Sequence, residues 1–297
     1  MKEYLVVASP RGLSADFIRE LEDTIKPAAV RRTYRELSLK NFAREYEVIA
    51  TTSENRRDLR NICQKHQTDM AIVPEKFRRV RQRLVVFDMD STLIQQEVIV
   101  EMARDYDKGE EVKRITERAM NGELDFDAAL RARISLLKGF QRTRMEKVRA
   151  RLTLSPGVAL FVRTFRLHGG ITAIASGGFH YFADFFREGL PMEYAFANDL
   201  DWDGEELSGV VRGEIVNAEK KKKILIELRE KHHLHPEETI AVGDGANDLL
   251  MLREAGLGVA WHAKEVVRKE ADLEINHGPM TTLLYFLGYE GDFFEAL

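Results

Sequence analysis

The chain has 297 residues, of which 44% are hydrophobic and 32% charged, and it carries a formal net charge of −4. This length indicates about two soluble domains, and the charge excludes a general affinity for nucleic acid or acidic membrane surfaces. A single cysteine excludes internal disulfides and cysteine-clustered zinc sites, and because no apolar run has the length of a signal peptide or a membrane span, we expect a cytoplasmic protein with no membrane partner.

Residues 1–75 are predicted to form a small N-terminal domain. Apolar or alternating stretches indicate strands at 4–7, 30–39, 46–51 and 70–73. Amphipathic spacing indicates one helix between Ser14 and Pro27 and another at 54–66. The resulting order, βαββαβ, is that of a ferredoxin-like domain, which occurs both in ligand-sensing modules and in inert appendages.

A basic run at residues 76–83 follows this domain. Two interpretations are open: a patch that binds nucleic acid, or a solvated linker between two domains. Because the run is short and isolated, we favour the linker and expect no nucleic-acid partner.

Residues 84–297 alternate between strands and helices, which predicts an α/β domain with a Rossmann-like, doubly wound parallel sheet. Strands are expected at 84–87, 171–175, 239–242, 257–260 and 273–275, with a hairpin at 193–212 and a long helix at 218–232. Helical patterns between the first two strands, at 95–106, 110–121, 126–137 and 142–152, indicate an α-helical cap inserted at about 94–155.

Polar and glycine residues follow several of these strands. Asp88 and Asp90 follow the first, Ser176-Gly177-Gly178 follows the second, and Asp244 follows the strand at 239–242. Because ligands of open α/β sheets lie at the carboxyl ends of the strands, we expect these residues to share a site. Buried carboxylates need a cation, and a Gly-rich turn before a helix can hold a phosphate, so the combination predicts a metal-and-phosphate site. Taken alone, the segment at Asp88 and Asp90 is equally compatible with a turn that caps the next helix, and Ser176-Gly177-Gly178 is more typical of a plain strand-to-helix turn. Helix capping does not explain Asp244.

Two further groups of residues bear on this site. Lys220–Lys223 lie near the start of the helix at 218–232, where the helix dipole disfavours cations. Most such runs form a solvated face, but one of these lysines can instead point toward an anion and offset carboxylate charge. Asn247 and Asp248 are candidates either for orienting a phosphate or metal-bound waters, or for capping a helix.

Taken in order, these segments resemble the haloacid dehalogenase (HAD) superfamily and, within it, the phosphoserine phosphatase family. The resemblance extends from about residue 83 to the C-terminus and is carried by Phe87–Leu93, Ser176–Phe179, Val242–Asp248 and Leu257–Lys264. Glu265 stands where the family often has proline, a change that we expect to be harmless. The N-terminal unit is similar in element order to the ACT-like domains of some family members, which suggests an amino-acid effector as a possible partner.

The resemblance implies the HAD fold and a Mg²⁺-dependent phosphatase that works through a phospho-aspartate. Asp88 corresponds to the nucleophile. Asp90 corresponds to the general acid and base, which protonates the leaving hydroxyl and then activates water. Mg²⁺ is expected to bind Asp88, the backbone carbonyl of Asp90, and Asp244.

The same resemblance implies how the phosphate is held. Ser176 and Gly177 are expected to bind phosphate oxygens, and Asn247 is a further substrate-binding candidate. The conserved lysine of the family aligns best with Lys221, judged by its spacing to Asp244, with Lys220 and Lys222 as the alternatives.

The cap points to the substrate. Glu97 matches the family's ammonium-binding glutamate and Arg133 its carboxylate-binding arginine, while Met120 and Phe126 match apolar residues that close over the substrate. A guanidinium–carboxylate pair gives direction as well as attraction. The implied substrate is O-phospho-L-serine, which would be hydrolysed to L-serine and phosphate in the last step of serine biosynthesis. Ordinary surface charge is the competing interpretation of Glu97 and Arg133.

Other functions remain open at this point. The same fold can serve a phosphatase for another small phosphoester, or a phosphotransferase to an alcohol such as homoserine. A different class of protein, a ligand-sensing regulator, would use the N-terminal domain, although intact catalytic segments argue against it. The sequence leaves the oligomeric state open, with a homodimer as one option.

Overall fold

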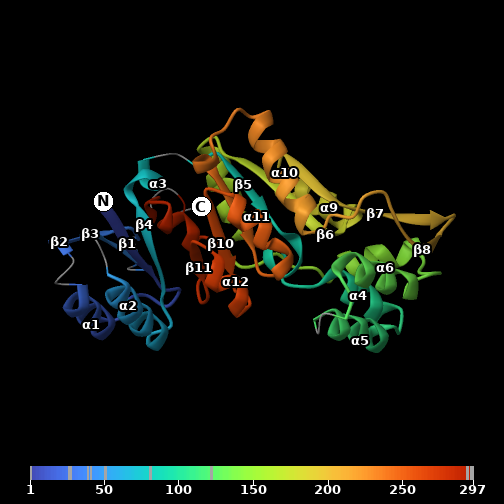
Figure 1. Cartoon of the computed structure of the whole chain (residues 1–297), viewed down its shortest axis with the longest axis horizontal. Coiled ribbons are helices and arrows are strands. Elements are labelled where there is room, and N and C mark those ends of the chain that lie inside the picture. Colours follow the sequence, from blue (N-terminus) through green and yellow to red (C-terminus); the bar gives the residue numbers. More distant parts are fainter. Residues whose placement is uncertain are drawn as a thin grey trace.

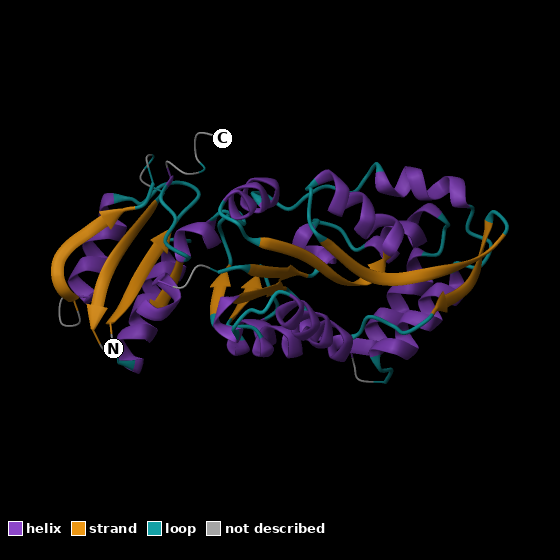
Figure 2. Ribbon diagram, turned by 90° about the horizontal axis from the view of Figure 1, so that it is seen from above, coloured by secondary structure: helices purple, strands orange, loops and turns teal. Residues whose placement is uncertain are grey.

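The computed structural model describes residues 2–25, 29–38, 40, 42–49, 52–79, 82–120, 123–291 and 294. Two β-sheets organise these residues, a four-stranded sheet near the N-terminus and a seven-stranded sheet. The small sheet, the large sheet and a helical cap lie in a row along the long axis of the molecule (Figure 1, Figure 2). Among the described residues, none of the helices has both the length and the apolar character needed to cross a membrane.

The N-terminal sheet is antiparallel and has the strand order β2-β3-β1-β4. The helices cover one face of this sheet, where Leu5, Phe17 and Leu59 are buried together. The predicted βαββαβ order is therefore confirmed. The elements are β1 (Lys2–Ala8), α1 (Ala15–Ile25), β2 (Ala29–Glu36), β3 (Ala43–Ile49), α2 (Ser53–Lys65) and β4 (Asp69–Pro74).

The opposite face of this sheet packs against the second half of the chain. Side chains alternate along a strand, so Val6 and Val73 point away from α1 and α2 and join a hydrophobic cluster with Phe286 of α13 (Thr282–Phe286). The buried carboxylate of Asp69 accepts hydrogen bonds from the backbone N–H groups of Asn276, His277 and Gly278. The contact between the two halves is thus both apolar and hydrogen-bonded.

The basic run after β4 begins within a short helix, α3 (Glu75–Arg79). Phe77 is partly buried against the hydrophobic core, and Lys76 Nζ lies 2.6 Å from Glu237 Oε1. Residues 80 and 81, and the side chains of Arg78 and Arg79, lie outside the described part of the structure. The domain boundaries at 1–75, 76–83 and 84–297, and the extent of the cap insert at about 94–155, stay predictions.

The large sheet has the strand order β11-β10-β9-β5-β6-β7-β8. All of its pairings are parallel except that of β7 with β8, which forms the predicted hairpin. The predicted parallel, doubly wound sheet is confirmed. Its strands are β5 (Leu84–Phe87), β6 (Ile171–Phe179), β7 (Tyr194–Asp203), β8 (Glu206–Arg212), β9 (Thr239–Gly243), β10 (Leu257–Trp261) and β11 (Leu273–Ile275).

Strand β5 is apolar throughout because helices cover both faces of the sheet. Val85 and Phe87 pack in one cluster with Phe161, whereas Leu84 and Val86 pack in another on the opposite face. The first face is covered by α8 (Val158–Leu167), α9 (His180–Gly189) and α13, and the second by α10 (Ala218–Lys231), α11 (Leu249–Glu254) and α12 (Glu265–Glu270). This sandwich fixes the carboxyl end of β5, where Asp88 follows.

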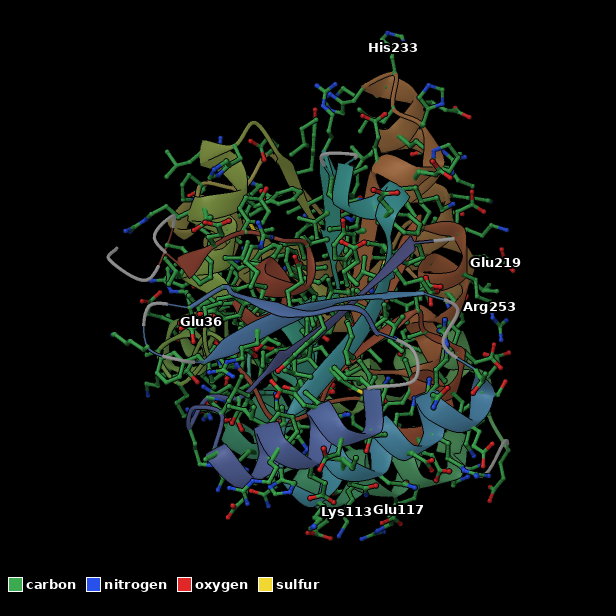
Figure 3. All side chains as sticks on the ribbon, turned by 90° about the vertical axis from the view of Figure 1, so that its left-hand side faces the viewer. Glu36, Lys113, Glu117, Glu219, His233 and Arg253 are labelled. Atoms are coloured by element: carbon green, nitrogen blue, oxygen red, sulfur yellow. The ribbon has the colours of Figure 1, made fainter. Side chains whose placement is uncertain are left out.

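The cap consists of four helices inserted between β5 and α8. Each lies within a predicted helical segment, apart from shifts at the ends. On α5, Val112 is buried, whereas Lys113 and Glu117 project outward at the edge of the molecule (Figure 3). The helices are α4 (Val98–Asp105), α5 (Gly109–Met120), α6 (Phe126–Leu136) and α7 (Arg142–Arg149).

The β7–β8 hairpin extends from the large sheet to the cap (Figure 1). Its backbone is hydrogen-bonded to the loop that joins α6 to α7 and to the first residue of α7: Gly139 N–H donates to Leu207 O, and Arg142 N–H donates to Glu205 O, each at 2.8 Å. The cap is therefore attached to the large sheet by the hairpin as well as by the two ends of the insert.

Candidate active site

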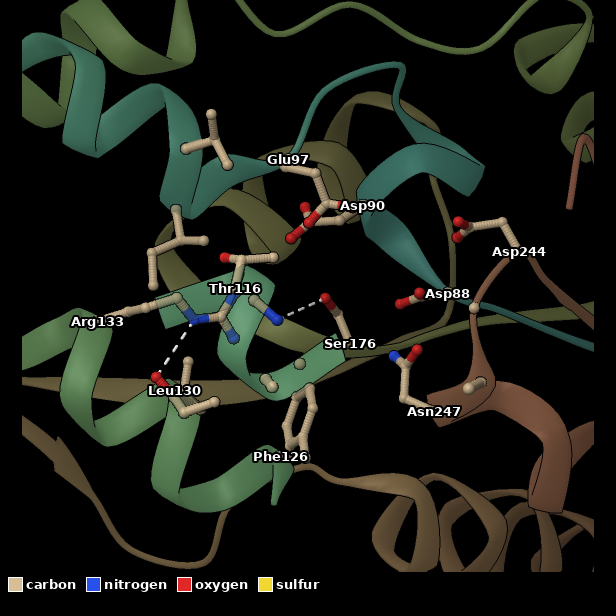
Figure 4. A pocket seen from close by; sticks show the side chains of 18 of the residues that line it. Asp88, Asp90, Glu97, Thr116, Phe126, Leu130, Arg133, Ser176, Asp244 and Asn247 are labelled. Atoms are coloured by element: carbon tan, nitrogen blue, oxygen red, sulfur yellow. Dashed lines mark hydrogen bonds between the residues drawn. The ribbon is translucent and has the colours of Figure 1, made fainter. Parts of the chain in front are cut away.

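The carboxyl ends of three neighbouring strands and the inner face of the cap enclose one cavity of about 720 Å³ (Figure 4). Asp88 follows β5, Ser176 lies in β6, and Asp244 follows β9. The structure thus brings together residues that are far apart in the sequence. The described residues that line the cavity include Asp88, Asp90, Glu97, Thr116, Leu124, Phe126, Leu130, Arg133, Ser176, Gly177, Asp244, Asn247 and Lys264.

Asp88 lies at the centre of a buried ion-pair network. Lys221 is fully buried, and its Nζ lies 2.7 Å from Oδ1 of both Asp88 and Asp248. Burial raises the pKa of Asp88, and the charge of Asp248 adds to this effect, whereas Lys221 opposes it. Burial by itself lowers the pKa of Lys221, but the charges of Asp248 and Asp88 outweigh it and raise that pKa above its ordinary value.

The other lysines of the run point elsewhere. Lys220 Nζ lies 2.8 Å from Glu214, and Lys222 Nζ lies 3.8 Å from Glu254. Lys221 is the member of the run that contacts Asp88, and Asn217 caps the start of its helix by accepting from Lys220 N–H at 3.1 Å.

The surroundings of Asp90 favour the protonated form of its carboxyl group. Burial raises the pKa of Asp90 well above its ordinary value, and the charges of Glu97 and Asp88 raise it further. Its Oδ1 atom is buried and has no hydrogen-bond partner among the described residues. Next to it, Ser91 has a left-handed backbone (φ 57°), and its hydroxyl donates to Glu97 Oε1 at 2.9 Å.

Carboxylate oxygens of Asp88, Asp244 and Asp248 lie within 4.8 Å of one another and could hold a metal ion. Asp248 binds Lys221 through one oxygen and the Gly245 N–H through the other (3.0 Å), so its role is to hold the lysine. Asp244 accepts a hydrogen bond from Thr92 Oγ1 at 3.2 Å. Burial and the charges of Asp248 and Glu97 raise the pKa of Asp244 to about 6. Crowded hard oxygen donors of one sign fit a divalent cation.

The Ser176-Gly177-Gly178 segment was predicted to follow the strand at 171–175, but it forms an irregular part of β6, where the pairing with β7 shifts between Ala175 and Phe179. This segment, called the Ser176 turn here, faces the carboxylate group. The Ser176 hydroxyl is fully buried and accepts a hydrogen bond from Gly178 N–H at 2.8 Å. A side chain at either glycine would displace a neighbour: a Cβ atom on Gly178 would lie 2.7 Å from Met89 Cε, and one on Gly177 would lie 2.7 Å from Phe126 Cζ. The turn therefore leaves space for an anion between itself and Asp88.

The cap supplies opposite charges to the same cavity. Arg133 lies across the cavity from Asp88, with its Nε donating to Ala129 O at 3.3 Å (Figure 4). Burial lowers the pKa of Arg133, and the charges of Glu97 and Asp90 oppose this change. The guanidinium stays charged because its ordinary pKa lies far above neutrality.

The remaining predicted site residues differ in whether the structure places them at the cavity. Phe126 covers the turn and Asn247 lines the cavity, as expected. Met120 ends α5, but its side chain lies outside the described residues. Sequence reasoning missed Thr116 as a lining residue, although Thr116 precedes Met120 by one helical turn and this spacing alone places both on one face of α5.

Comparisons with known proteins show the family to which the chain is similar. A family model described as haloacid dehalogenase-like hydrolase matches residues 82–256. A phosphoserine phosphatase of Archaeoglobus fulgidus is 40% identical over 241 residues, which cover 81% of this chain and 70% of the relative.

One solved structure extends the similarity to nearly the whole chain. A HAD family hydrolase of Salmonella enterica serovar Typhi superposes with a TM-score of 0.88 at 32% identity and covers 97% of this chain and 98% of its own. A phospho-aspartyl intermediate analogue of a phosphoserine phosphatase gives a TM-score of 0.66 at 38% identity, covering 69% of this chain and 99% of that one.

Proposed function

The chain belongs to the haloacid dehalogenase-like hydrolases, in the family of the phosphoserine phosphatases, and from this premise we propose that it hydrolyses O-phospho-L-serine to L-serine and phosphate. The observation that supports this substrate is the placement of Glu97 and Arg133 in the cavity that also contains Asp88 and Ser176. A free phosphoamino acid presents an ammonium group, a carboxylate and a phosphate, and this cavity offers a group of opposite charge or a hydrogen-bond donor to each.

In the first half of the proposed reaction, a carboxylate oxygen of Asp88 attacks phosphorus and the bond from phosphorus to the serine oxygen breaks. Asp90 gives its proton to that oxygen, so L-serine leaves as a neutral alcohol. The raised pKa of Asp90 suits this step, because the carboxyl must be protonated when the substrate arrives. Lys221 and the Ser176 turn bind the phosphoryl oxygens and stabilise their charge.

In the second half, Asp90 accepts a proton from water, and the water oxygen attacks phosphorus while the bond to Asp88 breaks. Inorganic phosphate is released and both carboxyl groups return to their starting states. Phe126 and the other apolar cap residues exclude bulk water until serine has left.

A divalent ion fits the carboxylates of this site, and we take it to be Mg²⁺, which Asp88, Asp244 and the backbone carbonyl of Asp90 would hold. When bound, the ion neutralises charge on the phosphate and allows an anionic nucleophile to approach.

Phosphate release from purified full-length protein tests the proposal. With Mg²⁺ present, O-phospho-L-serine should be hydrolysed much faster than phosphothreonine or sugar phosphates, and removal of the metal with a chelator should stop the reaction. The Asp88→Asn variant should be inactive while remaining folded. Hydrolysis confined to sugar phosphates would refute the serine assignment, and an active Asp88→Asn variant would refute the nucleophile.

A further inference from the structure

Asn198, a residue of β7, lies directly behind the Ser176-Gly177-Gly178 turn and is only 1% exposed. Its side-chain amide donates to two backbone carbonyls of this turn, Gly177 O at 2.8 Å and Gly178 O at 3.2 Å. Asn198 does not line the catalytic cavity, so any effect on the reaction has to pass through the groups that it holds.

The strand register explains why this amide is needed. Ala175 pairs with Phe196 and Phe179 pairs with Asn198, so β6 has two more residues than β7 between these pairs. The turn therefore bulges out of the parallel ladder, and its carbonyls lose their partners on β7. The side chain of Asn198 takes the place of the missing backbone donors.

Fixing the Gly177 carbonyl also fixes the next N–H group. The peptide unit is planar, with its N–H opposite its C=O, so the Gly178 N–H is directed away from Asn198. That N–H donates to the Ser176 hydroxyl at 2.8 Å. Asn198 thus orients the Ser176 hydroxyl through one peptide group, in a chain of hydrogen bonds whose members reinforce one another.

The same side chain reaches a second element of the site. Its Oδ1 atom accepts a hydrogen bond from Val216 N–H at 2.8 Å. Val216 directly precedes Asn217, which caps the helix that carries Lys221. One buried amide therefore connects the Ser176 turn to the start of the helix whose lysine contacts Asp88.

We propose that Asn198 is a positioning residue for the phosphoryl site: it holds the Ser176-Gly177-Gly178 turn and the start of α10 in the mutual arrangement that receives a tetrahedral oxyanion. This inference builds on the proposed function only in assuming that the cavity binds a phosphoryl group. It does not depend on the identity of the alcohol.

Two variants test the proposal in full-length protein with Mg²⁺. Asn198→Asp has nearly the same shape and keeps the acceptor for Val216, but it loses both donors to the turn. Asn198→Ser is too short to reach either partner. Thr239→Val is the matched control. The Thr239 side chain is as buried as that of Asn198, and its hydroxyl donates to Pro236 O and accepts from Gly256 N–H. Thr239 begins β9, so it lies at the end of that strand opposite to the catalytic site.

The test uses O-phospho-L-serine, p-nitrophenyl phosphate and orthovanadate, which share a phosphoryl or phosphoryl-like group. We expect both Asn198 variants to lower kcat/KM at least about 10-fold, by the same factor for O-phospho-L-serine and for p-nitrophenyl phosphate, and to weaken orthovanadate binding in calorimetry by a comparable factor. Thr239→Val should lower thermal stability without changing these constants. Equal losses on both substrates distinguish the turn from Arg133, whose removal should affect phosphoserine alone.

A folded Asn198→Asp or Asn198→Ser protein with wild-type kcat/KM and orthovanadate affinity would overturn the inference. A wild-type protein that binds orthovanadate and hydrolyses p-nitrophenyl phosphate but not phosphoserine would instead refute the proposed substrate. The two failures are thus separate. If the variants lose stability only, as Thr239→Val is expected to do, Asn198 has a structural role and the proposal is wrong.

Discussion

Lys221 offsets the negative charge of two carboxylates of the site. Its Nζ lies 2.7 Å from Asp88 and 2.7 Å from Asp248, and its side chain is fully buried. A buried ion pair is tolerated when each charge keeps partners, whereas removing one partner leaves the others uncompensated. The arrangement stabilises two buried carboxylates and leaves the nearby Asp244 available for a metal ion.

Arg133 is expected to select the substrate. We expect Arg133→Ala to lower kcat/KM for O-phospho-L-serine about 10- to 100-fold, since a charge-assisted pair is worth about 1.5–3 kcal/mol. The rate on p-nitrophenyl phosphate, which lacks the amino-acid group, should hardly change. Arg131→Ala is the control, because Arg131 is exposed on the same helix. Equal losses on the two substrates would contradict the assigned role of Arg133.

Metal binding should depend on the protonation of Asp244, whose pKa burial raises to about 6. A carboxyl with a raised pKa takes up a proton as the pH falls through that value, and the proton competes with the metal. The Kd for Mg²⁺ should therefore rise at least about fourfold between about pH 7.5 and about pH 5.5. Calorimetric titration of substrate-free protein measures this change, and a constant Kd across the range would show that Asp244 does not bind the ion.

At the scale of single residues, the sequence indicated candidate site residues that belong to recognisable motifs. It did not reveal residues whose role depends on hydrogen bonds to the backbone of other elements. Asp88, Ser176 and Asp244 stand at strand ends and could be assembled from topology alone. Asn198 could not, because its role depends on a register shift between β6 and β7 that no local pattern reveals. The contact of Asp248 with Lys221 likewise requires the packing of α10 against α11.

Helix α10 is the element that links stability to catalysis. Asn217 caps it and also donates to Asp127 of cap helix α6 at 3.1 Å. Asn217→Ala should lower stability by about 1 kcal/mol, the ordinary cost of losing an N-cap. The variant should also lower kcat, because the first turn of α10 sets the position of Lys221.

Thr52→Ala is the matched control for this prediction. Thr52 caps α2 of the N-terminal domain by accepting from Asn55 N–H at 3.2 Å, far from the cavity. Circular dichroism should show a similar fall in melting temperature of about 2–4 °C for both variants. If Thr52→Ala reduces kcat as much as Asn217→Ala does, the effect is one of general stability, and the special role of α10 is wrong.

The elements themselves were largely predictable, and their ends were not. The segment at 142–152 was expected to be helical throughout, yet α7 ends at Arg149. The helix predicted from Gln95 begins only at Val98, because the chain first bridges back to Leu154 through Ile94. Such ends are decided by tertiary hydrogen bonds and not by the local apolar period.

On the scale of the whole molecule, Asp69 connects the N-terminal sheet to the second half of the chain. Its buried carboxylate accepts from Asn276 N–H at 2.7 Å, His277 N–H at 3.1 Å and Gly278 N–H at 2.6 Å. Asp69→Ala would leave these donors without an acceptor, and we expect a loss of about 3 kcal/mol and separate unfolding of the two halves. Calorimetry should then show two transitions where the wild type shows one.

Asp272→Ala serves as the control for that experiment. Asp272 accepts a single backbone bond, from Gly258 N–H at 2.8 Å, within the second half of the chain. Its loss should cost about 1 kcal/mol and leave the two halves coupled. Identical scans for the two variants would show that the Asp69 contact does not hold the halves together. The sequence could not reveal this contact, because it joins residues more than 200 positions apart.

The β7–β8 hairpin has a consequence for engineering. Leu207 and Glu205 belong to the large sheet by chain order, but their backbone pairs with the cap at Gly139 and Arg142. A chimaera that imports a foreign cap by exchanging only the insert would therefore face a mismatched strand edge. Recombination between relatives should succeed when the tip of the hairpin and the cap insert are both taken from the same parent protein.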